Sequence, residues 1–293
     1  MYAIMGITGQ VGGAVARTLL KAGKTVRGIV RDKAKAANWL EAGVELVVAD
    51  QADQESLKAA FQDVAGLFVM LPANFAPSPG FEEPRALIAT LTSAVAAVKP
   101  RKIVALSSIG AHRKQGLGLI TQLHLLEDAL STTTSPTAFL RPGWFIENIA
   151  WDIEPAAKTG TFPSFLQPLD KPVPMVATDD VGRVAAELLQ EEWQGTRVVE
   201  LEGPTRVSPN DLSTALSLAL EKSVSAIPVP RNEWESLFKG QGTSWPTPRI
   251  EMLDGFNTNW ISFEGAPATH VRGRLNLQTA VQLLVDQRQN TKR

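Results

Sequence analysis

The chain has 293 residues, a formal net charge of −1 at pH 7 and no cysteine. Without a basic field to attract them, nucleic acid and anionic membranes are excluded as main partners. The lack of cysteine excludes disulfides, thiolate nucleophiles and cysteine-bound metal sites. Hydrophobic residues make up 44% of the chain, which indicates a folded protein, and its length predicts one large domain with a smaller lobe.

We expect a cytoplasmic protein that does not bind membranes. The first apolar run starts at Tyr2, which leaves no room for a signal peptide. No apolar run reaches the roughly 18 residues that are needed to span a bilayer.

The first stretch joins an apolar run to a glycine-rich turn. Gly6, Gly9 and Gly12 follow the run at intervals of three, and a helical pattern then continues to Gly23, a residue suited to closing a helix. A strand, a turn and a helix present free N–H groups and a positive dipole end to a phosphate. Because the spacing differs from G-x-G-x-x-G by one residue, the motif alone allows pyrophosphate binding or simple chain reversal.

A second strand is expected over residues 25–30, directly before Arg31 and Asp32. In dinucleotide-binding sheets this strand end meets the adenosine ribose, where a carboxylate favours NAD and a guanidinium pairs with the 2′-phosphate of NADP. We predict that Arg31 binds the 2′-phosphate, with Lys33 or Lys35 as helpers. The alternative is that Arg31 is a solvated charge that opens the next helix.

Further strands and helices alternate up to residue 140. Strands are expected over residues 44–49, 66–71, 102–106 and 137–140, and helices over residues 35–40, 53–61, 83–98 and 119–130. The alternation predicts a parallel sheet with helices on both faces. Asp50 either bonds the adenine amino group or begins the turn into the next helix. The loop 75–84 is either a flap over the site or a plain surface connection.

Four motifs occur in a characteristic order: GITGQVG at residues 6–12, VRD at 30–32, HLLE at 124–127 and LRPGWFIEN at 140–148. Together they resemble the NmrA-like group of atypical short-chain dehydrogenases, which includes NADP(H)-sensing regulators and NAD(P)H-dependent quinone oxidoreductases. The resemblance implies an α/β fold, a Rossmann-type doubly wound parallel sheet that binds NADP(H), with a smaller C-terminal α+β lobe closing over the nicotinamide.

The domain boundaries follow from this comparison. We expect an NADP-binding domain of residues 1–150, to which residues 176–203 return. Residues 151–175 and 204–293 would then form the smaller lobe for a substrate or a partner.

The resemblance also implies roles for individual residues. The glycine turn would hold the pyrophosphate, through Gly6, Thr8, Gly9, Gln10, Val11 and Gly12. Arg31 would hold the 2′-phosphate, and Leu71 and Pro72 would pack near the ribose or nicotinamide. The nicotinamide side would be lined by Ser107, His124, Pro142, Trp144 and Phe145.

The usual catalytic pair of short-chain dehydrogenases is absent from the sequence. Those enzymes protonate a carbonyl with a tyrosine that is activated by a lysine four residues on, and the only tyrosine here is Tyr2. The chemistry left is hydride transfer to an acceptor that needs little acid catalysis, such as a quinone. His124 is the candidate proton donor, which Glu127 could orient from the same helix face. Alternatively, His124 bonds the cofactor ribose or simply packs.

Other polar residues are expected to be structural. Arg141, Glu147 and Asn148 should hold their turn by hydrogen bonds. His112 and His270 lack partners at ligand spacing, so we expect no metal site.

In the C-terminal half, residues 151–174 are expected to be an irregular, proline-rich excursion. Helices are predicted over 178–189, capped by Thr178 or Asp179, and over 208–220, capped by Ser208, with strands over 197–201 and 224–229. The aromatic residues of 231–262 form either a pocket for a planar substrate or an ordinary core. A closing helix is expected over 277–285, followed by a frayed tail over 286–293.

Two functions fit these observations. The first is an NADPH-dependent oxidoreductase that reduces a small, quinone-like acceptor. The second is a non-catalytic NADP(H)-sensing regulator that binds a protein partner, which the missing tyrosine favours.

Overall fold

The computed structural model describes residues 1–291, and a parallel sheet of eight strands lies at the centre of this part of the chain. The strand order is β12-β10-β6-β5-β4-β1-β2-β3, and every neighbouring pair is parallel. The strands are β1 (Tyr2–Met5), β2 (Val26–Val30), β3 (Glu45–Val48), β4 (Gly66–Val69), β5 (Ile103–Leu106), β6 (Thr137–Pro142), β10 (Thr196–Glu202) and β12 (Thr269–Arg272). The predicted Rossmann-type doubly wound sheet is confirmed.

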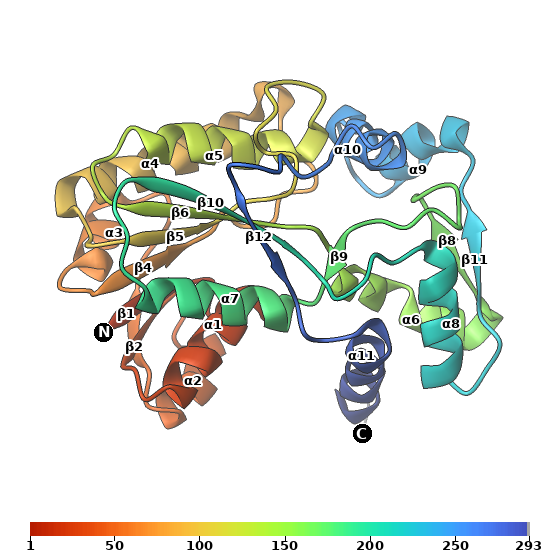
Figure 1. Cartoon of the computed structure of the whole chain (residues 1–293), viewed down its shortest axis with the longest axis horizontal. Helices are drawn as coiled ribbons and strands as arrows, with labels where there is room; N and C mark the ends of the chain where they lie inside the picture. The colour runs from red at the N-terminus through yellow and green to blue at the C-terminus, as the bar shows by residue number, and fades with distance from the viewer. Residues whose placement is uncertain (292–293) are drawn as a thin grey trace.

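Helices cover both faces of the sheet (Figure 1). One face carries α1 (Gln10–Lys21), η1 (Ala34–Ala36), α2 (Ala37–Glu41) and α7 (Thr178–Gln190), and the other carries α3 (Gln54–Phe61), α4 (Glu82–Val98) and α5 (Thr121–Ser131). Strand β1 feeds both cores because its side chains alternate: Ile4 packs in the first, and Ala3 and Met5 pack in the second. Burial on both faces explains why the central strands read as continuous apolar runs.

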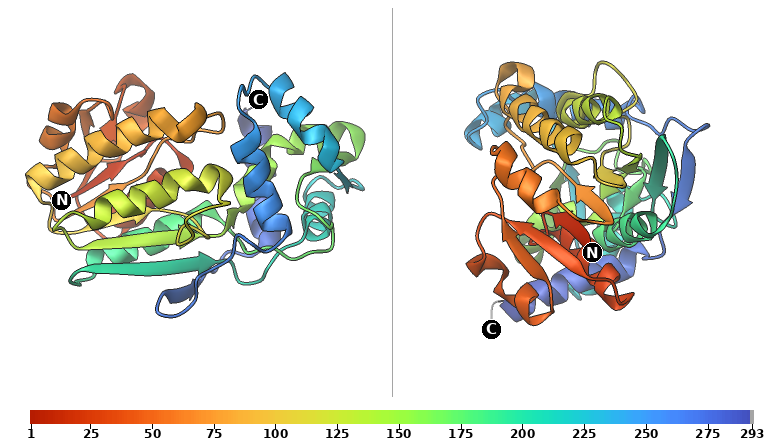
Figure 2. Two further views of the ribbon diagram at one scale, coloured as in Figure 1. Left: turned by 90° about the horizontal axis from the view of Figure 1, so that it is seen from above. Right: turned by 90° about the vertical axis from the view of Figure 1, so that its left-hand side faces the viewer.

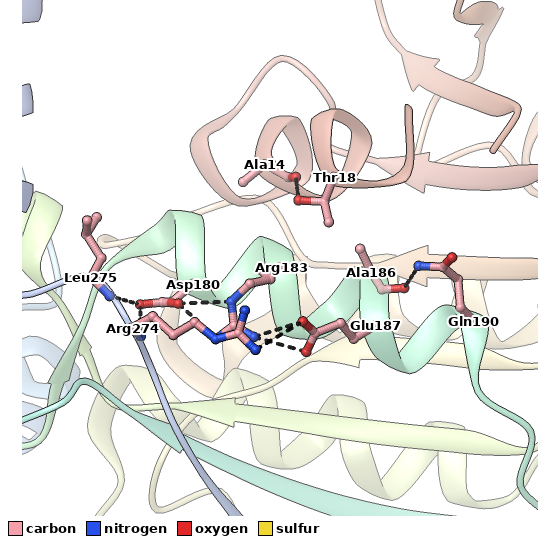
Figure 3. Close-up of polar contacts among 9 residues, drawn as sticks. All are labelled: Ala14, Thr18, Asp180, Arg183, Ala186, Glu187, Gln190, Arg274 and Leu275. Atoms are coloured by element: carbon pink, nitrogen blue, oxygen red, sulfur yellow. Dashed lines mark hydrogen bonds and ion pairs between the residues drawn. The ribbon is translucent and has the colours of Figure 1, made fainter. Parts of the chain in front are cut away.

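Helices α1 and α7 pack closely (Figure 3). A Cβ added to Gly182 would lie 2.3 Å from the Cβ of Ala14, so only glycine fits at this contact. At the start of α7, the buried Asp180 carboxylate accepts hydrogen bonds from the backbone N–H groups of Arg274 and Leu275, at 2.7 and 2.8 Å. Helix α7 therefore contacts both α1, the first helix of the chain, and the segment just before the C-terminal helix.

The remaining elements gather at one end of the sheet (Figure 2). They are η2 (Pro79–Phe81), η3 (Gly118–Ile120), β7 (Trp144–Phe145), η4 (Ile146–Trp151), α6 (Ile153–Thr159), β8 (Thr161–Ser164), β9 (Met175–Val176), α8 (Pro209–Ala219), β11 (Ser225–Pro228), η5 (Arg231–Glu233), α9 (Trp234–Gly240), α10 (Thr247–Asn257) and α11 (Leu277–Thr291). Strands β8 and β11 form one small parallel pair, and β7 and β9 form another. Within residues 1–291, no helix has the length and apolar character that crossing a membrane requires.

Three predictions about the C-terminal half were wrong, and one strand was missed. The excursion 151–174 is not irregular, because it contains α6 and β8, and Pro155 lies in the first turn of α6, where proline is tolerated. Strand β12 was not predicted because its four residues are mostly exposed at the sheet edge and carry no apolar pattern. Helix α11 continues to Thr291 instead of ending at residue 285, and residues 292–293 lie outside the described part.

The fourth correction concerns the start of α7. Neither Thr178 nor Asp179 caps this helix, whose N-cap is Ala177. The carboxylate of Glu147 instead accepts hydrogen bonds from the backbone N–H and the hydroxyl of Thr178, both at 2.8 Å. By contrast, Ser208 caps α8 as predicted, in a reciprocal pair with Asp211.

Candidate functional site

The site is built where the chain reverses its winding direction. Strands β1 and β4 are neighbours, and the chain continues from them toward opposite edges of the sheet. In open parallel sheets, ligands bind in the crevice at the carboxyl ends of such strands. The glycine turn leaves β1 here, and Met70, Leu71 and Pro72 leave β4 beside it.

The glycine turn requires glycine for steric reasons. Gly6 has a φ of +68°, and its carbonyl oxygen accepts a hydrogen bond of 2.9 Å from the N–H of Gly9. A Cβ on Gly12 would lie 2.3 Å from that same oxygen. A Cβ on Gly6 would lie 2.6 Å from the sulfur of Met70, so the end of β4 packs directly against the turn.

The turn leaves the start of α1 open. Gly9 is the N-cap, and no side chain among the described residues caps this helix. Thr8, Gly9 and Gln10 are exposed, while Val11 is buried beneath them. Unpaired N–H groups and the positive end of the helix dipole therefore lie at the carboxyl end of β1, as an anion-binding turn requires.

Arg31 and Asp50 follow β2 and β3 and are both exposed. The Asp50 carboxylate accepts a hydrogen bond of 2.9 Å from the N–H of Ala52, so it supports the turn toward α3. Asp32 bonds the N–H of Ala34 in the same way, and so opens η1 next to Arg31.

A buried ion pair lies behind the ends of β5 and β6. The Arg141 guanidinium donates to both carboxylate oxygens of Glu127, at 2.8 and 2.6 Å, and to Glu264 at 2.5 Å. Burial alone would lower the pKa of Arg141, but the hydrogen bonds and charges of these glutamates raise it. The buried Ser107 hydroxyl also donates to Glu127. Because Glu127 makes these contacts, it does not orient His124 as the sequence suggested.

His124 has different neighbours from those expected. Its Nδ1 lies 2.8 Å from the carbonyl oxygen of Ala111, to which it can only donate. Its Nε2 lies 3.4 Å from Asp128, a largely exposed carboxylate one turn further along α5. Nε2 is therefore the nitrogen that could exchange a proton with a ligand.

The segment after β6 turns sharply toward the lobe. A Cβ on Gly143 would lie 2.4 Å from the carbonyl oxygen of Pro174, so only glycine fits at this position. Pro142 is buried, whereas Trp144 and Phe145 are half-buried, and the Trp144 ring contacts Phe256 edge-on at 5.2 Å between centroids. Burial raises the pKa of Glu147, although the hydrogen bonds from Thr178 oppose the effect. Arg141 and Glu147 thus make structural hydrogen bonds, but to residues outside their own turn, and Asn148 is exposed.

Several hydrogen bonds and ring contacts around the site join residues far apart in the chain and were not predicted. The loop after β5 is held by Trp260, whose Nε1 donates to Gln115 at 3.1 Å and whose ring stacks under Arg113. The buried Gln122 donates to the carbonyl oxygen of Asn74, at 3.1 Å. Such contacts leave no local pattern, because each joins residues far apart in the chain.

Of the two earlier alternatives for the aromatic residues of 231–262, an ordinary core holds for Trp234 and Phe238. Trp234 and Phe238 are almost fully buried and pack on Phe165, so they form core. Within residues 1–291, no cluster of three metal-binding side chains occurs. His270 pairs with Glu202 at 3.0 Å, and burial lowers the pKa of His112.

Residues 2–252 match the model of the NmrA-like family. The chain belongs to the NmrA-like family. It is 25% identical over 243 residues to the NAD(P)H azoreductase of Xenophilus azovorans, covering 83% of this chain and 82% of that protein. It is 26% identical over 255 residues to quinone oxidoreductase 2 of Escherichia coli (strain K12), covering 86% and 85%.

Solved structures share the fold. Triphenylmethane reductase of Citrobacter sp. has a TM-score of 0.77 at 22% identity, covering 97% of this chain and 99% of that one. An NADPH-dependent quinone oxidoreductase of Escherichia coli has a TM-score of 0.75 at 22% identity, with the same coverage. The glycine turn thus belongs to a complete fold of this kind and not to an isolated motif.

Proposed function

We propose that this protein binds NADP(H) and transfers hydride from NADPH to a quinone-like or other small planar acceptor. The observation that carries the proposal is the glycine turn, which opens the N-terminus of α1 at the switch point of the sheet. The names of the relatives support the acceptor class, because azo compounds, quinones and triphenylmethane dyes are all conjugated molecules.

The cofactor contacts follow from the positions of the strand ends. Thr8, Gln10 and Val11 would hold the pyrophosphate, and Arg31 would pair with the 2′-phosphate at the end of β2. Asp50 follows β3 on the adenine side. The remaining contacts would come from Leu71, Pro72, Ser107, Pro142, Trp144 and Phe145. Bound NADPH supplies the hydride, and the chain supplies position and the exclusion of water.

Reduction of a quinone to a hydroquinone takes one hydride, which carries both electrons, and one proton. We propose that the Nε2 of His124 delivers a proton, because Nδ1 is fixed as a donor to Ala111. Asp128 lies 3.4 Å from Nε2. Steady-state NADPH oxidation with quinones and azo dyes tests the proposal; NADPH binding without turnover of any acceptor would overturn it.

We also propose the division of the chain into residues 1–150 with 176–203 and a lobe of 151–175 with 204–293. Separate apolar clusters support it: two flank the main sheet, and two lie mainly among the lobe helices. Strand β12 is the exception, because it pairs with β10 in the main sheet. Limited proteolysis would test the division.

A second candidate function is a regulator that senses NADP(H). It is favoured by the missing Tyr-x-x-x-Lys pair and by α7, which contacts both α1 and the segment before α11. A protein partner retained differently with NADP⁺ and NADPH would support this function; equal retention would contradict it.

A further inference from the structure

The loop that leaves β4 holds an aromatic ring in solvent. Phe75 is 59% exposed, although burial of a ring of this size stabilises a folded protein. The loop begins at Met70, whose sulfur packs against the Gly6 turn. Phe75 therefore lies close along the chain to Met70, the residue that contacts the proposed cofactor turn.

The backbone on either side of Phe75 is fixed. The buried Gln122 on α5 donates a hydrogen bond of 3.1 Å to the carbonyl oxygen of Asn74. The Asn74 side chain in turn accepts a hydrogen bond of 3.1 Å from the N–H of Ala76. These two contacts hold the residues before and after Phe75. Binding of a ligand to its ring would therefore cost little conformational entropy of the loop.

The far end of the loop is attached to the lobe. Ser78 donates its backbone N–H to Glu83 at 3.1 Å. The buried Phe81 ring contacts Trp245 edge-on, with centroids 5.3 Å apart, and Trp245 lies between α9 and α10. The loop thus runs from the Gly6 turn to the lobe.

We propose that Phe75 is the residue on which the planar acceptor stacks, and that it selects acceptors with extended ring systems. This inference rests on the proposed function. Aromatic pairs gain about 0.5–1.5 kcal/mol beyond simple burial. A ring on an anchored loop can gain this energy from any conjugated acceptor, without hydrogen bonds specific to one compound.

The test compares Phe75→Ala with wild type in two assays. Calorimetry measures binding of menadione, a two-ring quinone, and of one-ring benzoquinone to the protein loaded with NADP⁺. Steady-state kinetics measure KM and kcat for the same quinones. The absence of cysteine removes the thiols that quinones would otherwise modify.

We expect Phe75→Ala to weaken menadione binding and raise its KM by about 3- to 10-fold, with a smaller effect for benzoquinone. Binding of NADPH and kcat should be unchanged, and Phe75→Trp should restore menadione binding. The control is Trp151→Ala, since Trp151 is 81% exposed on the lobe but belongs to no part of the site; it should leave all values unchanged.

Several results would overturn the inference: unchanged menadione binding in Phe75→Ala, an equal loss of NADPH affinity, or the same loss in Trp151→Ala. Failure of the proposed function gives a different pattern. Menadione binding that depends on Phe75 without any NADPH oxidation would support the stacking role and reject the reductase. Quinone turnover that is unchanged in Phe75→Ala would support the reductase and reject the stacking role.

Discussion

Gly12 approaches Gly6 so closely that a Cβ on Gly12 would lie 2.3 Å from the Gly6 carbonyl oxygen. This contact folds the turn back on itself and fixes where the start of α1 lies beside the end of β1. A side chain at residue 12 would push the turn open by displacing backbone, which cannot move away as a flexible side chain could.

Replacing Gly12 by Ala should therefore weaken NADPH binding at least about tenfold, measured by calorimetry, and lower stability by about 1–3 kcal/mol. Gly23→Ala is the matched control. Gly23 has a φ of +69° with open space around it, so the change should lower stability by about 1 kcal/mol without affecting NADPH. Equal affinity losses in both variants would show that the turn has no special role.

Arg31→Ala should weaken NADPH binding roughly 10- to 100-fold and leave NADH within about twofold, since only NADPH carries the 2′-phosphate. Titrations of both cofactors measure this difference. Arg101→Ala, at another exposed arginine before β5, should change neither affinity. Equal losses for the two cofactors in Arg31→Ala would reject the 2′-phosphate contact.

His124→Gln should lower kcat about tenfold or more while NADPH affinity stays the same, because the variant keeps a polar side chain but cannot deliver the proton. His270→Gln, on edge strand β12, is the control. An unchanged kcat would contradict proton transfer. A selective loss of NADPH affinity would instead indicate that His124 bonds the ribose.

Glu127→Gln should destabilise the protein by about 3–5 kcal/mol, since it leaves Arg141 buried with its main partner uncharged. Urea unfolding followed by circular dichroism measures this change. Glu187→Gln removes one carboxylate of a more exposed pair with Arg183 and should change stability by less than about 1 kcal/mol. Similar losses of stability in the two variants would contradict a larger contribution of the buried ion pair to stability.

Burial raises the pKa of Asp152 from 3.8 to about 6. The folded state thus holds this proton more tightly than the unfolded state, so the contribution of Asp152 to stability falls as pH rises from about 4 to 6. After allowance for partial exposure, Asp152→Asn should stabilise the protein by about 1–2 kcal/mol at pH 7 and hardly at all at pH 4. Unfolding curves at both pH values measure it, and an equal effect at both would contradict the raised pKa.

The sequence predicted the parallel sheet and the glycine turn because both follow from local patterns. Apolar runs such as residues 66–69 are buried on both faces, and Gly6 and Gly12 have the conformation and spacing that a tight turn requires. Strand β12 carries no such pattern, since its pairing with β10 depends on a segment far away in the chain.

Hydrogen-bond and ion-pair partners that are distant in the chain could not be predicted from the sequence for the same reason. Glu127 lies one turn from His124, and helical spacing alone could not show that it pairs with Arg141 instead. Likewise, Glu147 stabilises the start of α7 from 31 residues away, where a local cap was expected. Buried charges choose partners by three-dimensional position, which a local pattern does not contain.

Hydride transfer itself provides the most direct test of the account. Wild-type protein would be mixed with NADPH and menadione in a stopped-flow instrument, using NADPH and its 4-deuterated forms and following absorbance at 340 nm. We expect rapid loss of NADPH, slowed by deuterium on one face of the nicotinamide only. Tight NADPH binding with no loss of absorbance, with menadione or any other conjugated acceptor, would contradict it.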